Sequence, residues 1–177
     1  MTAPAKIGIL TISDRASAGL YADESGPAIH AYLAETLVSD WVALARTVPD
    51  GVASVADALV DLSDTQGCDL ILTTGGTGPS PRDLTPEAVR QVIGREFPGF
   101  GEVMRRISFE TVPTAILSRQ LAGTRNRTLI ITLPGKPASI RTCLGAIFPA
   151  VPYCLDLIGA ARIDTDPAQC VAFRPKA

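Results

Sequence analysis

The chain has 177 residues, of which 46% are hydrophobic, and it carries a formal net charge of −2 with a pI near 5.4. This length and apolar content suffice for the core of one domain, and the charge lacks the basic excess typical of proteins that bind nucleic acid. No apolar run approaches the roughly 18 residues of a membrane span, and the N-terminus lacks a signal-peptide pattern. We therefore predict a single cytoplasmic domain over residues 1–177, with neither a nucleic-acid nor a membrane partner.

Cysteine and histidine are sparse. The chain has four cysteines and one histidine, His30, and no two cysteines form a C-x-x-C pair. A structural zinc site usually needs about four such ligands clustered in sequence, so none is expected. Three of the cysteines lie in apolar surroundings, which predicts buried free thiols and favours a reducing compartment.

The first half of the chain alternates apolar runs with helical patterns. Residues 6–12 form an apolar run rich in β-branched residues that predicts a buried strand. Apolar positions between 29 and 37 then recur at helical spacing, with Ser25 as the expected N-cap. A strand over 43–48, a helix over 52–60 and a strand over 70–74 follow.

The second half continues this alternation. A helix is expected from Pro86, with Thr85 as its N-cap, and Pro98-Gly99 should end it. Further helices are predicted over 101–109, 140–147 and 151–158, and strands over 115–121 and 128–133, joined by the basic turn 123–127. The order predicts an α/β domain whose sheet is mostly parallel, covered on both faces and extended by an antiparallel addition.

Ligands bind such sheets beyond the carboxyl ends of the strands. Three polar or glycine-rich segments stand there: Ser13-Asp14-Arg15, residues 75–83 and Pro134-Gly135-Lys136. The second is the most informative, because three glycines directly after a strand let backbone N–H groups approach phosphate oxygens. It is neither a Walker A loop nor a G-x-G-x-x-G fingerprint, and a tight strand-to-helix turn is an equal alternative.

Two aspartates flank this region. Asp83 lies before a predicted helix, and Asp50 follows a predicted strand. Each has an ordinary alternative: Asp83 could favour the helix dipole, and Asp50 could be a helix N-cap, the more common role at its position. If their strands are neighbours, the two carboxylates face one cleft and suit a Mg²⁺ ion that serves nucleotidyl transfer.

Further polar residues stand at other strand ends. Arg15 could hold a phosphate through two hydrogen bonds, or pair locally with Asp14 or Asp23. Ser118-Arg119 could bind a polar heterocycle or phosphate, or form an ordinary edge strand. Lys136 could lie in solvent at a helix start. We find no nucleophile elbow and no Ser/His pairing, which disfavours a hydrolase with a histidine base.

Seven segments, in order along nearly the whole chain, resemble the molybdopterin adenylyltransferases, a family that includes the bacterial MogA-type enzymes and the G domain of gephyrin. Each glycine motif alone is weak, but the ordered combination is highly specific. The segments are IGILTISDRASAG (7–19), VPD (48–50), TTGGTGPSPRDLTPEA (73–88), PGFGEVMRRIS (98–108), PTAILSRQLAG (113–123), LIITLPGKPASI (129–140) and AVPYC (150–154).

The resemblance implies a three-layer α/β sandwich and a homotrimer. It implies a nucleotidyltransferase that moves AMP from Mg-ATP to the terminal phosphate of molybdopterin and releases pyrophosphate, in molybdenum cofactor biosynthesis. A molybdenum-insertion protein is a possible downstream partner. In the matching motifs, Asp50 and Asp83 are the catalytic residues, with Mg²⁺ held by one of them or by both, and Ser118 belongs to the pterin-side loop.

The remaining site residues fall into two groups. The expected nucleotide-binding residues are Thr74, Gly75, Gly76, Thr77 and Gly78. Together with Ser118, the expected substrate-binding residues are Ser13, Arg15, Arg119, Pro134 and Gly135.

Two alternatives of other classes stay open. The chain could be a non-catalytic molybdopterin-binding paralogue or a scaffold domain, although the presence of both aspartates and Ser118 argues against lost activity. It could also be a nucleotide-binding module that does not bind a pterin. ATP binding by such a module would be insensitive to changes at Ser118.

Overall fold

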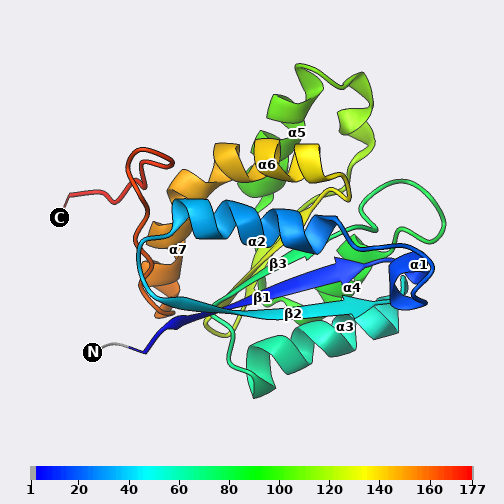
Figure 1. The fold of residues 1–177 in the computed structure, drawn as a ribbon, viewed down its shortest axis with the longest axis horizontal. Coiled ribbons are helices and arrows are strands. Elements are labelled where there is room, and N and C mark those ends of the chain that lie inside the picture. Colours follow the sequence, from blue (N-terminus) through cyan, green and yellow to red (C-terminus); the bar gives the residue numbers. More distant parts are fainter. Residues whose placement is uncertain (1–2, 177) are drawn as a thin grey trace.

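The computed structural model describes residues 3–176 and contains a six-stranded sheet within that range (Figure 1). The order across the sheet is β2-β1-β3-β6-β5-β4. The first four of these are mutually parallel, whereas β5 runs antiparallel to both β6 and β4. The strands are β1 (Ala5–Ile12), β2 (Trp41–Val48), β3 (Leu70–Thr74), β4 (Arg95–Glu96), β5 (Ala122–Arg125) and β6 (Thr128–Leu133).

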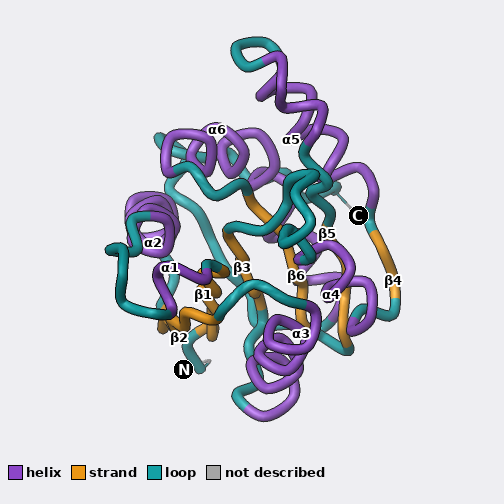
Figure 2. Tube along the Cα trace, turned by 90° about the vertical axis from the view of Figure 1, so that its right-hand side faces the viewer, coloured by secondary structure: helices purple, strands orange, loops and turns teal. Residues whose placement is uncertain are grey.

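Helices cover both faces of this sheet, which confirms the predicted three-layer sandwich. Figure 2 shows α2, α5 and α6 on one side of the strands and α3 and α4 on the other. The helices are α1 (Asp14–Ser17), α2 (Ser25–Thr36), α3 (Val52–Val60), α4 (Thr85–Val92), α5 (Pro98–Phe109), α6 (Pro137–Ile147) and α7 (Val151–Ile158). Three shorter helical segments are π-helix η1 (Asp61–Thr65) and 3₁₀-helices η2 (Pro113–Leu117) and η3 (Phe148–Ala150).

The central strands divide the core in two because successive side chains point to opposite faces. In β3, Leu70 and Leu72 pack in the cluster that contains α2, α6 and α7. Ile71 packs in the cluster that contains α3 and α4. All five residues of β3 are buried, as expected for a central parallel strand.

The predicted strand over 115–121 is wrong. Residues 113–117 form η2, and the strand that pairs with β6 starts only at Ala122 and runs to Arg125, into the predicted basic turn. Pro113 favours the first turn of a helical segment and lacks an N–H for a ladder. Ile116 is 65% exposed, so this apolar run does not enter the core. The antiparallel pair itself is confirmed, on shifted residues.

The expected N-caps also differ. Asp23 replaces Ser25 at the start of α2, since its Oδ1 accepts hydrogen bonds from the N–H groups of Ser25 (2.9 Å) and Gly26 (3.1 Å). Thr85 donates its hydroxyl hydrogen to Gly75 O (2.9 Å) rather than capping α4. Helix α5 begins at Pro98, three residues before the prediction, because proline is favoured in a first helical turn.

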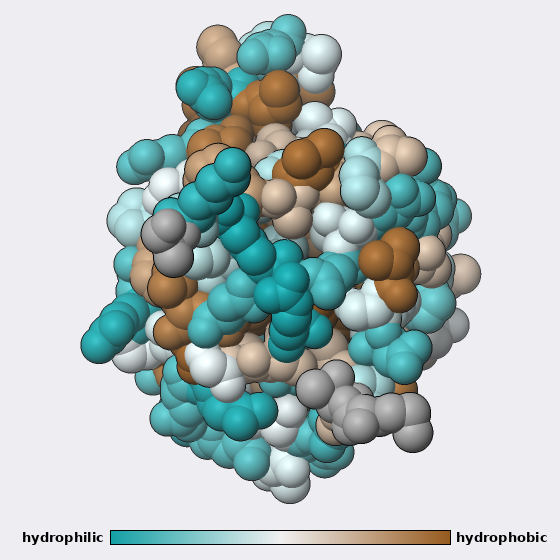
Figure 3. Space-filling view, turned by 90° about the vertical axis from the view of Figure 1, so that its left-hand side faces the viewer, coloured by the Kyte–Doolittle hydropathy of each residue, from teal (hydrophilic) through white to brown (hydrophobic). Residues whose placement is uncertain are grey.

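The stretch 137–158, through α6, η3 and α7, is long and apolar enough to cross a membrane by length and composition alone. Its hydropathy arises largely from side chains that belong to the core, including Leu144, Phe148 and Leu155. The core helix of a soluble protein meets the same criterion. Figure 3 shows the side of the molecule where both chain ends lie, with apolar atoms in separate groups among polar ones. All four cysteines are free, and three are buried.

Candidate active site

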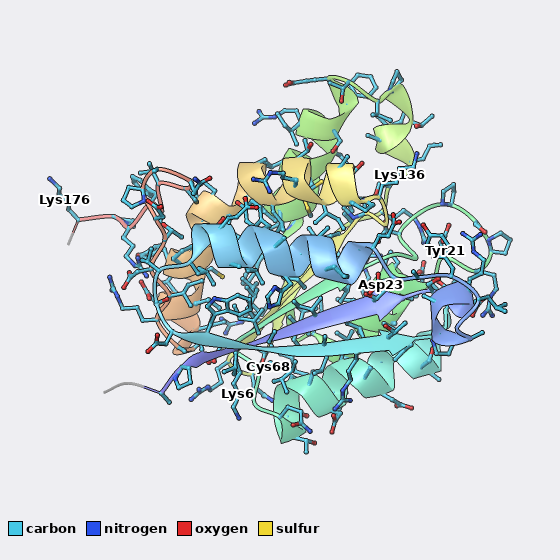
Figure 4. The ribbon with its side chains drawn as sticks, in the orientation of Figure 1. Lys6, Tyr21, Asp23, Cys68, Lys136 and Lys176 are labelled. Carbon is cyan, nitrogen blue, oxygen red and sulfur yellow. The ribbon has the colours of Figure 1, made fainter. Side chains whose placement is uncertain are left out.

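The carboxyl ends of β1, β3 and β6 lie at one edge of the sheet. Figure 4 shows Tyr21, Asp23 and Lys136 at this edge, far from Lys6 and Cys68. Thr74 joins two of the strand ends through a hydrogen bond from its Oγ1 to Pro134 O (2.8 Å). The three segments selected from the sequence therefore meet at one edge, as their strand order requires.

Glycine is needed at the start of the loop after β3. Gly75 and Gly76 have φ of +98° and +65°, conformations that other residues rarely adopt. A Cβ on Gly75 would lie 2.2 Å from Ile12 O, so the loop packs directly on the end of β1. On Gly76 it would lie 2.3 Å from Thr85 Oγ1. The loop is thus held between β1 and α4.

Asp50 and Asp83 both approach this loop. Asp50 Oδ1 lies 3.3 Å from the position of a Cβ on Gly76, and Asp83 Oδ2 lies 2.8 Å from that on Gly78. One oxygen of each carboxylate is occupied: Asp50 Oδ2 accepts from Asp14 N (2.8 Å), and Asp83 Oδ2 accepts from Ser80 N (3.0 Å). Asp50 does not cap α3 through its side chain.

The second oxygen of each aspartate, Oδ1, accepts no hydrogen bond within residues 3–176. Carboxylate oxygens are the ligands that Mg²⁺ prefers, and the ion usually completes its shell with phosphate oxygens and water. Both carboxylates border a loop of small residues and each keeps one oxygen free, which fits such an ion. Within the described range, no group of three or more His, Cys, Asp or Glu residues forms a self-contained metal site, so phosphate would have to contribute.

Asp14 and Arg82 brace Asp50, and sequence reasoning missed this. The Arg82 guanidinium donates to both Asp14 carboxylate oxygens and to Asp50 O (2.9 Å), while Asp50 N donates to Asp14 Oδ1 (3.1 Å). The hydrogen bond with Asp14 raises the pKa of Arg82 above its ordinary value. The sequence did offer one indication of their importance: Asp14 is adjacent to Ser13 and Arg82 is adjacent to Asp83, within the two motifs that contain those residues.

Arg119 holds the glycine loop. Its N–H donates to Thr77 O (2.8 Å), its Nε donates to Gly78 O (3.0 Å), and its two terminal nitrogens donate to Asp83 O and to the carboxylate of Glu87. The side chain thus spans the turn that carries Asp83. We refer to these contacts as the Arg119 clamp. Arg119 is therefore not the outward-pointing arginine of an edge strand, because its side chain contacts the protein itself. Its predicted binding of substrate stays a prediction.

Glu87 completes the clamp. Burial raises its pKa, but the hydrogen bond from Arg119, a backbone hydrogen bond and the charges of Arg119 and Arg90 outweigh that effect. The pKa of Glu87 is therefore lowered, and the carboxylate stays ionised at neutral pH.

A cavity of about 490 Å³ opens beside the loop. We call it the larger cavity, to distinguish it from the smaller one described next. Ser118 lines it, 3.5 Å from Thr77 Oγ1 through its own hydroxyl. Five of the predicted site residues contribute to its wall, namely Thr77, Gly78, Ser118, Pro134 and Gly135. Lys136, from the same strand end, also lines it, so it does not merely stand in solvent.

A second cavity of about 220 Å³ adjoins the first at Gly135. Ser13, Arg15, Thr74 and Gly75 line it. Arg15 stacks over Tyr21, with 5.2 Å between its guanidinium carbon and the ring centroid, instead of pairing with Asp14 or Asp23. The other predicted site residues therefore line one or both of two adjoining cavities, whereas Asp50, Asp83, Gly76 and Arg119 line neither.

Comparisons with known proteins agree with this geometry. Residues 8–153 match the family model described as a probable molybdopterin binding domain. The chain is 52% identical to the molybdopterin adenylyltransferase of Helicobacter pylori over 96% of this chain and 97% of the relative. It is 45% identical to that of Escherichia coli K12, over 97% and 94%.

Solved structures give the same result. The molybdopterin biosynthesis enzyme MoaB of Thermus thermophilus superposes with a TM-score of 0.81 at 42% identity, over 89% of this chain and 98% of that one. The family match, the near-complete sequence coverage and the shared fold lead to one conclusion. The chain belongs to the molybdopterin-binding domain family that contains the molybdopterin adenylyltransferases.

Proposed function

We propose that this protein is a molybdopterin adenylyltransferase that uses Mg-ATP. The observation that carries the proposal is the pair of carboxylates, Asp50 and Asp83, that border a glycine loop and each keep one oxygen free of protein partners. A binding domain without chemistry has no need of two such carboxylates beside a glycine loop. The names of the close relatives support the same activity.

The reaction follows from the chemistry of the groups. An oxygen of the terminal phosphate of molybdopterin attacks the α-phosphorus of ATP, and the new P–O bond forms as the bond to the β-phosphate oxygen breaks. The bonding electrons leave with pyrophosphate. The attacking phosphate is already anionic, so no protein base is required, and the single histidine lies elsewhere, stacked near Trp41.

Three parts of the chain would serve this reaction. Asp50 and Asp83 would hold Mg²⁺, which when bound offsets negative charge on the phosphates. The glycine loop would present N–H groups to the nucleotide phosphates, with the Arg119 clamp fixing its shape. Ser118 and the larger cavity would take the pterin. We also propose a cytoplasmic homotrimer that passes its product to a molybdenum-insertion protein.

Mass spectrometry of the pterin product tests this function. The protein is incubated with molybdopterin, ATP and Mg²⁺, and we expect a product that carries an added adenylate. Unmodified molybdopterin that nevertheless co-purifies with the protein would support the alternative, a pterin-binding paralogue or scaffold.

A further inference from the structure

We propose that Gln120 reads a hydrogen-bond donor on the pterin ring and so sets the heterocycle specificity of the larger cavity. The proposal rests on the proposed function, because it deepens the role of the same site. Gln120 lines the cavity together with Ser118 and Ser108, and only 4% of the residue is exposed. A buried amide at a cavity wall is costly unless its polar atoms find partners.

The amide nitrogen of Gln120 donates hydrogen bonds to two sulfur atoms. Nε2 donates to Met104 Sδ (3.8 Å) and to Cys143 Sγ (3.6 Å). A thioether has no hydrogen and can only accept, so this orientation gives Met104 Sδ a donor, whereas the flipped amide would bring two acceptors together. Burial raises the pKa of the Cys143 thiol, which therefore stays protonated and uncharged at neutral pH. The contact with Met104 therefore favours the orientation that directs Nε2 to the sulfur atoms.

The amide oxygen is left for a ligand. Oε1 accepts no hydrogen bond from residues 3–176. Within that range, the fully buried polar side-chain atoms that lack a hydrogen-bond partner are Thr73 Oγ1 and Glu87 Oε2. The Gln120 oxygen is not one of them, so it is not fully buried, and its residue lines the cavity. It is an acceptor that can be satisfied only by a donor brought in by water or ligand.

The backbone holds this acceptor in place. Residues 118–120 run as an extended segment after η2, so Ser118 and Gln120 reach the cavity while Arg119 points the other way into its clamp. Arg105 Nη1 donates to Gln120 O (2.8 Å), which fixes the segment from a second side. The backbone that carries the Gln120 side chain is therefore held before any ligand arrives, which lowers the entropic cost of binding.

The chemistry of the acceptor selects the ligand class. The pyrimidine half of a pterin presents two neighbouring hydrogen-bond donors, the 2-amino group and the N3–H. A single carbonyl oxygen that faces this edge can accept a hydrogen bond from them. Ser118 and Ser108 hydroxyls can donate or accept beside it. A site that hydrogen-bonds a ligand N–H strongly rejects analogues without that hydrogen, because its own buried group is then left unpaired.

Ligand titration of pterin fluorescence tests the inference without turnover. The probes are 6-hydroxymethylpterin, its lumazine analogue, in which oxygen replaces the 2-amino group, and its N3-methyl analogue. Wild-type protein should bind the pterin at least about 10-fold more tightly than one of the two analogues. Equal affinity for all three probes would overturn the proposal, and this arm needs no substitution.

Gln120→Met supplies the second arm. Methionine has a similar length and packs well against sulfur, and it replaces the amide oxygen with a thioether, which is only a weak acceptor. We expect the preference among the three probes to disappear and the KM for molybdopterin to rise about 10- to 100-fold, while the KM for ATP is unchanged. A variant that keeps the wild-type preference would refute a reading role for Gln120. Thermal unfolding by circular dichroism establishes that the variant is folded.

Gln91→Met is the matched control, since it makes the same change at an exposed position of α4. The experiments distinguish a failure of the role proposed for Gln120 from a failure of the proposed enzyme activity. Molybdopterin-dependent turnover that is equal in wild type and Gln120→Met would refute the reading role and leave the enzyme assignment intact. If the wild-type protein shows no turnover but prefers the pterin, and Gln120→Met removes that preference, the role of Gln120 would stand and the enzyme assignment would be refuted.

Discussion

Aspartates stand at both ends of the parallel strands, and they differ in how many of their oxygens are occupied. At the amino end, Asp69 precedes β3, and its side chain is only 6% exposed. Its Oδ2 accepts from Lys6 N (2.9 Å), and its Oδ1 accepts from Ala161 N (2.8 Å) and Arg127 Nη2 (3.5 Å). This residue joins β1, β3 and the C-terminal segment.

At the carboxyl end, Asp50 and Asp83 each have one occupied oxygen and one free oxygen. The same residue type therefore serves the fold at one end and remains available for chemistry at the other. The comparison teaches that an aspartate at a strand end is a candidate ligand only if its partners leave an oxygen free. Sequence cannot show this difference, because every partner that decides it is distant along the chain or a backbone group.

Substitution at the carboxyl end should have the largest effect. Asp83→Asn replaces a charged oxygen with a neutral amide, and we expect turnover to fall on the order of 100-fold or more, because Mg²⁺ loses a charged ligand. Binding of molybdopterin should be spared, as measured by pterin fluorescence. Asp57→Asn, at an exposed position of α3, is the control. Wild-type turnover by Asp83→Asn would remove Asp83 from the mechanism.

The Arg119 clamp should rank second. Arg119→Lys cannot reach Gly78 O, Asp83 O and Glu87 together, because an ammonium lacks the planar fork of a guanidinium. We expect kcat to fall about 10- to 100-fold, as for other residues that orient a metal ligand. The KM values for both substrates should change little, and added guanidinium should restore part of the rate. A rise in one KM with unchanged kcat would instead support the substrate contact predicted from the sequence. Arg90→Lys, which pairs with Glu96 on the surface, is the control.

At the amino end, stability and not activity should change. Asp69→Asn turns one acceptor into a donor that faces a backbone N–H, and we expect a loss of about 1–3 kcal/mol in the free energy of unfolding. Urea denaturation measures this loss. Turnover per folded molecule should stay at the wild-type level. A variant with unchanged stability but reduced turnover would erase the contrast between the two ends.

The smallest effect concerns pH. Because the pKa of Glu87 is lowered from its ordinary 4.5, its contribution to stability is present above that value and is lost as pH falls through the folded-state pKa. Both clamp side chains are more than a third exposed, so we expect less than about 1 kcal/mol. Urea midpoints between about pH 3 and pH 7 should fall less steeply for Glu87→Gln than for wild type. Parallel curves would show that the ion pair is not linked to folding.

Much of the fold follows from local pattern. The strands 70–74 and 128–133 were predictable because apolar β-branched runs this short suit buried parallel strands. The antiparallel addition was also predictable, but its residues were not. Ala115-Ile116-Leu117 has strand composition, yet the following segment bonds to the glycine loop through Arg119 N and to Thr132 Oγ1 through Leu121 N.

The site was predictable to the same extent. Strand ends and glycines located its loops, and the resemblance assigned roles to Asp50, Asp83 and Ser118. Asp14, Arg82 and Gln120 were missed, since their importance depends on contacts between segments up to 68 residues apart. A sequence motif places residues on a loop, and only the folded structure shows which of their polar atoms are still free.

The measurement that tests the account most directly is pyrophosphate release from Mg-ATP by the purified protein, with and without molybdopterin. We predict release that requires molybdopterin, that Asp69→Asn retains and that Asp83→Asn loses. Equal release with and without molybdopterin, or none in its presence while the pterin is bound, would contradict the assignment of an adenylyltransferase.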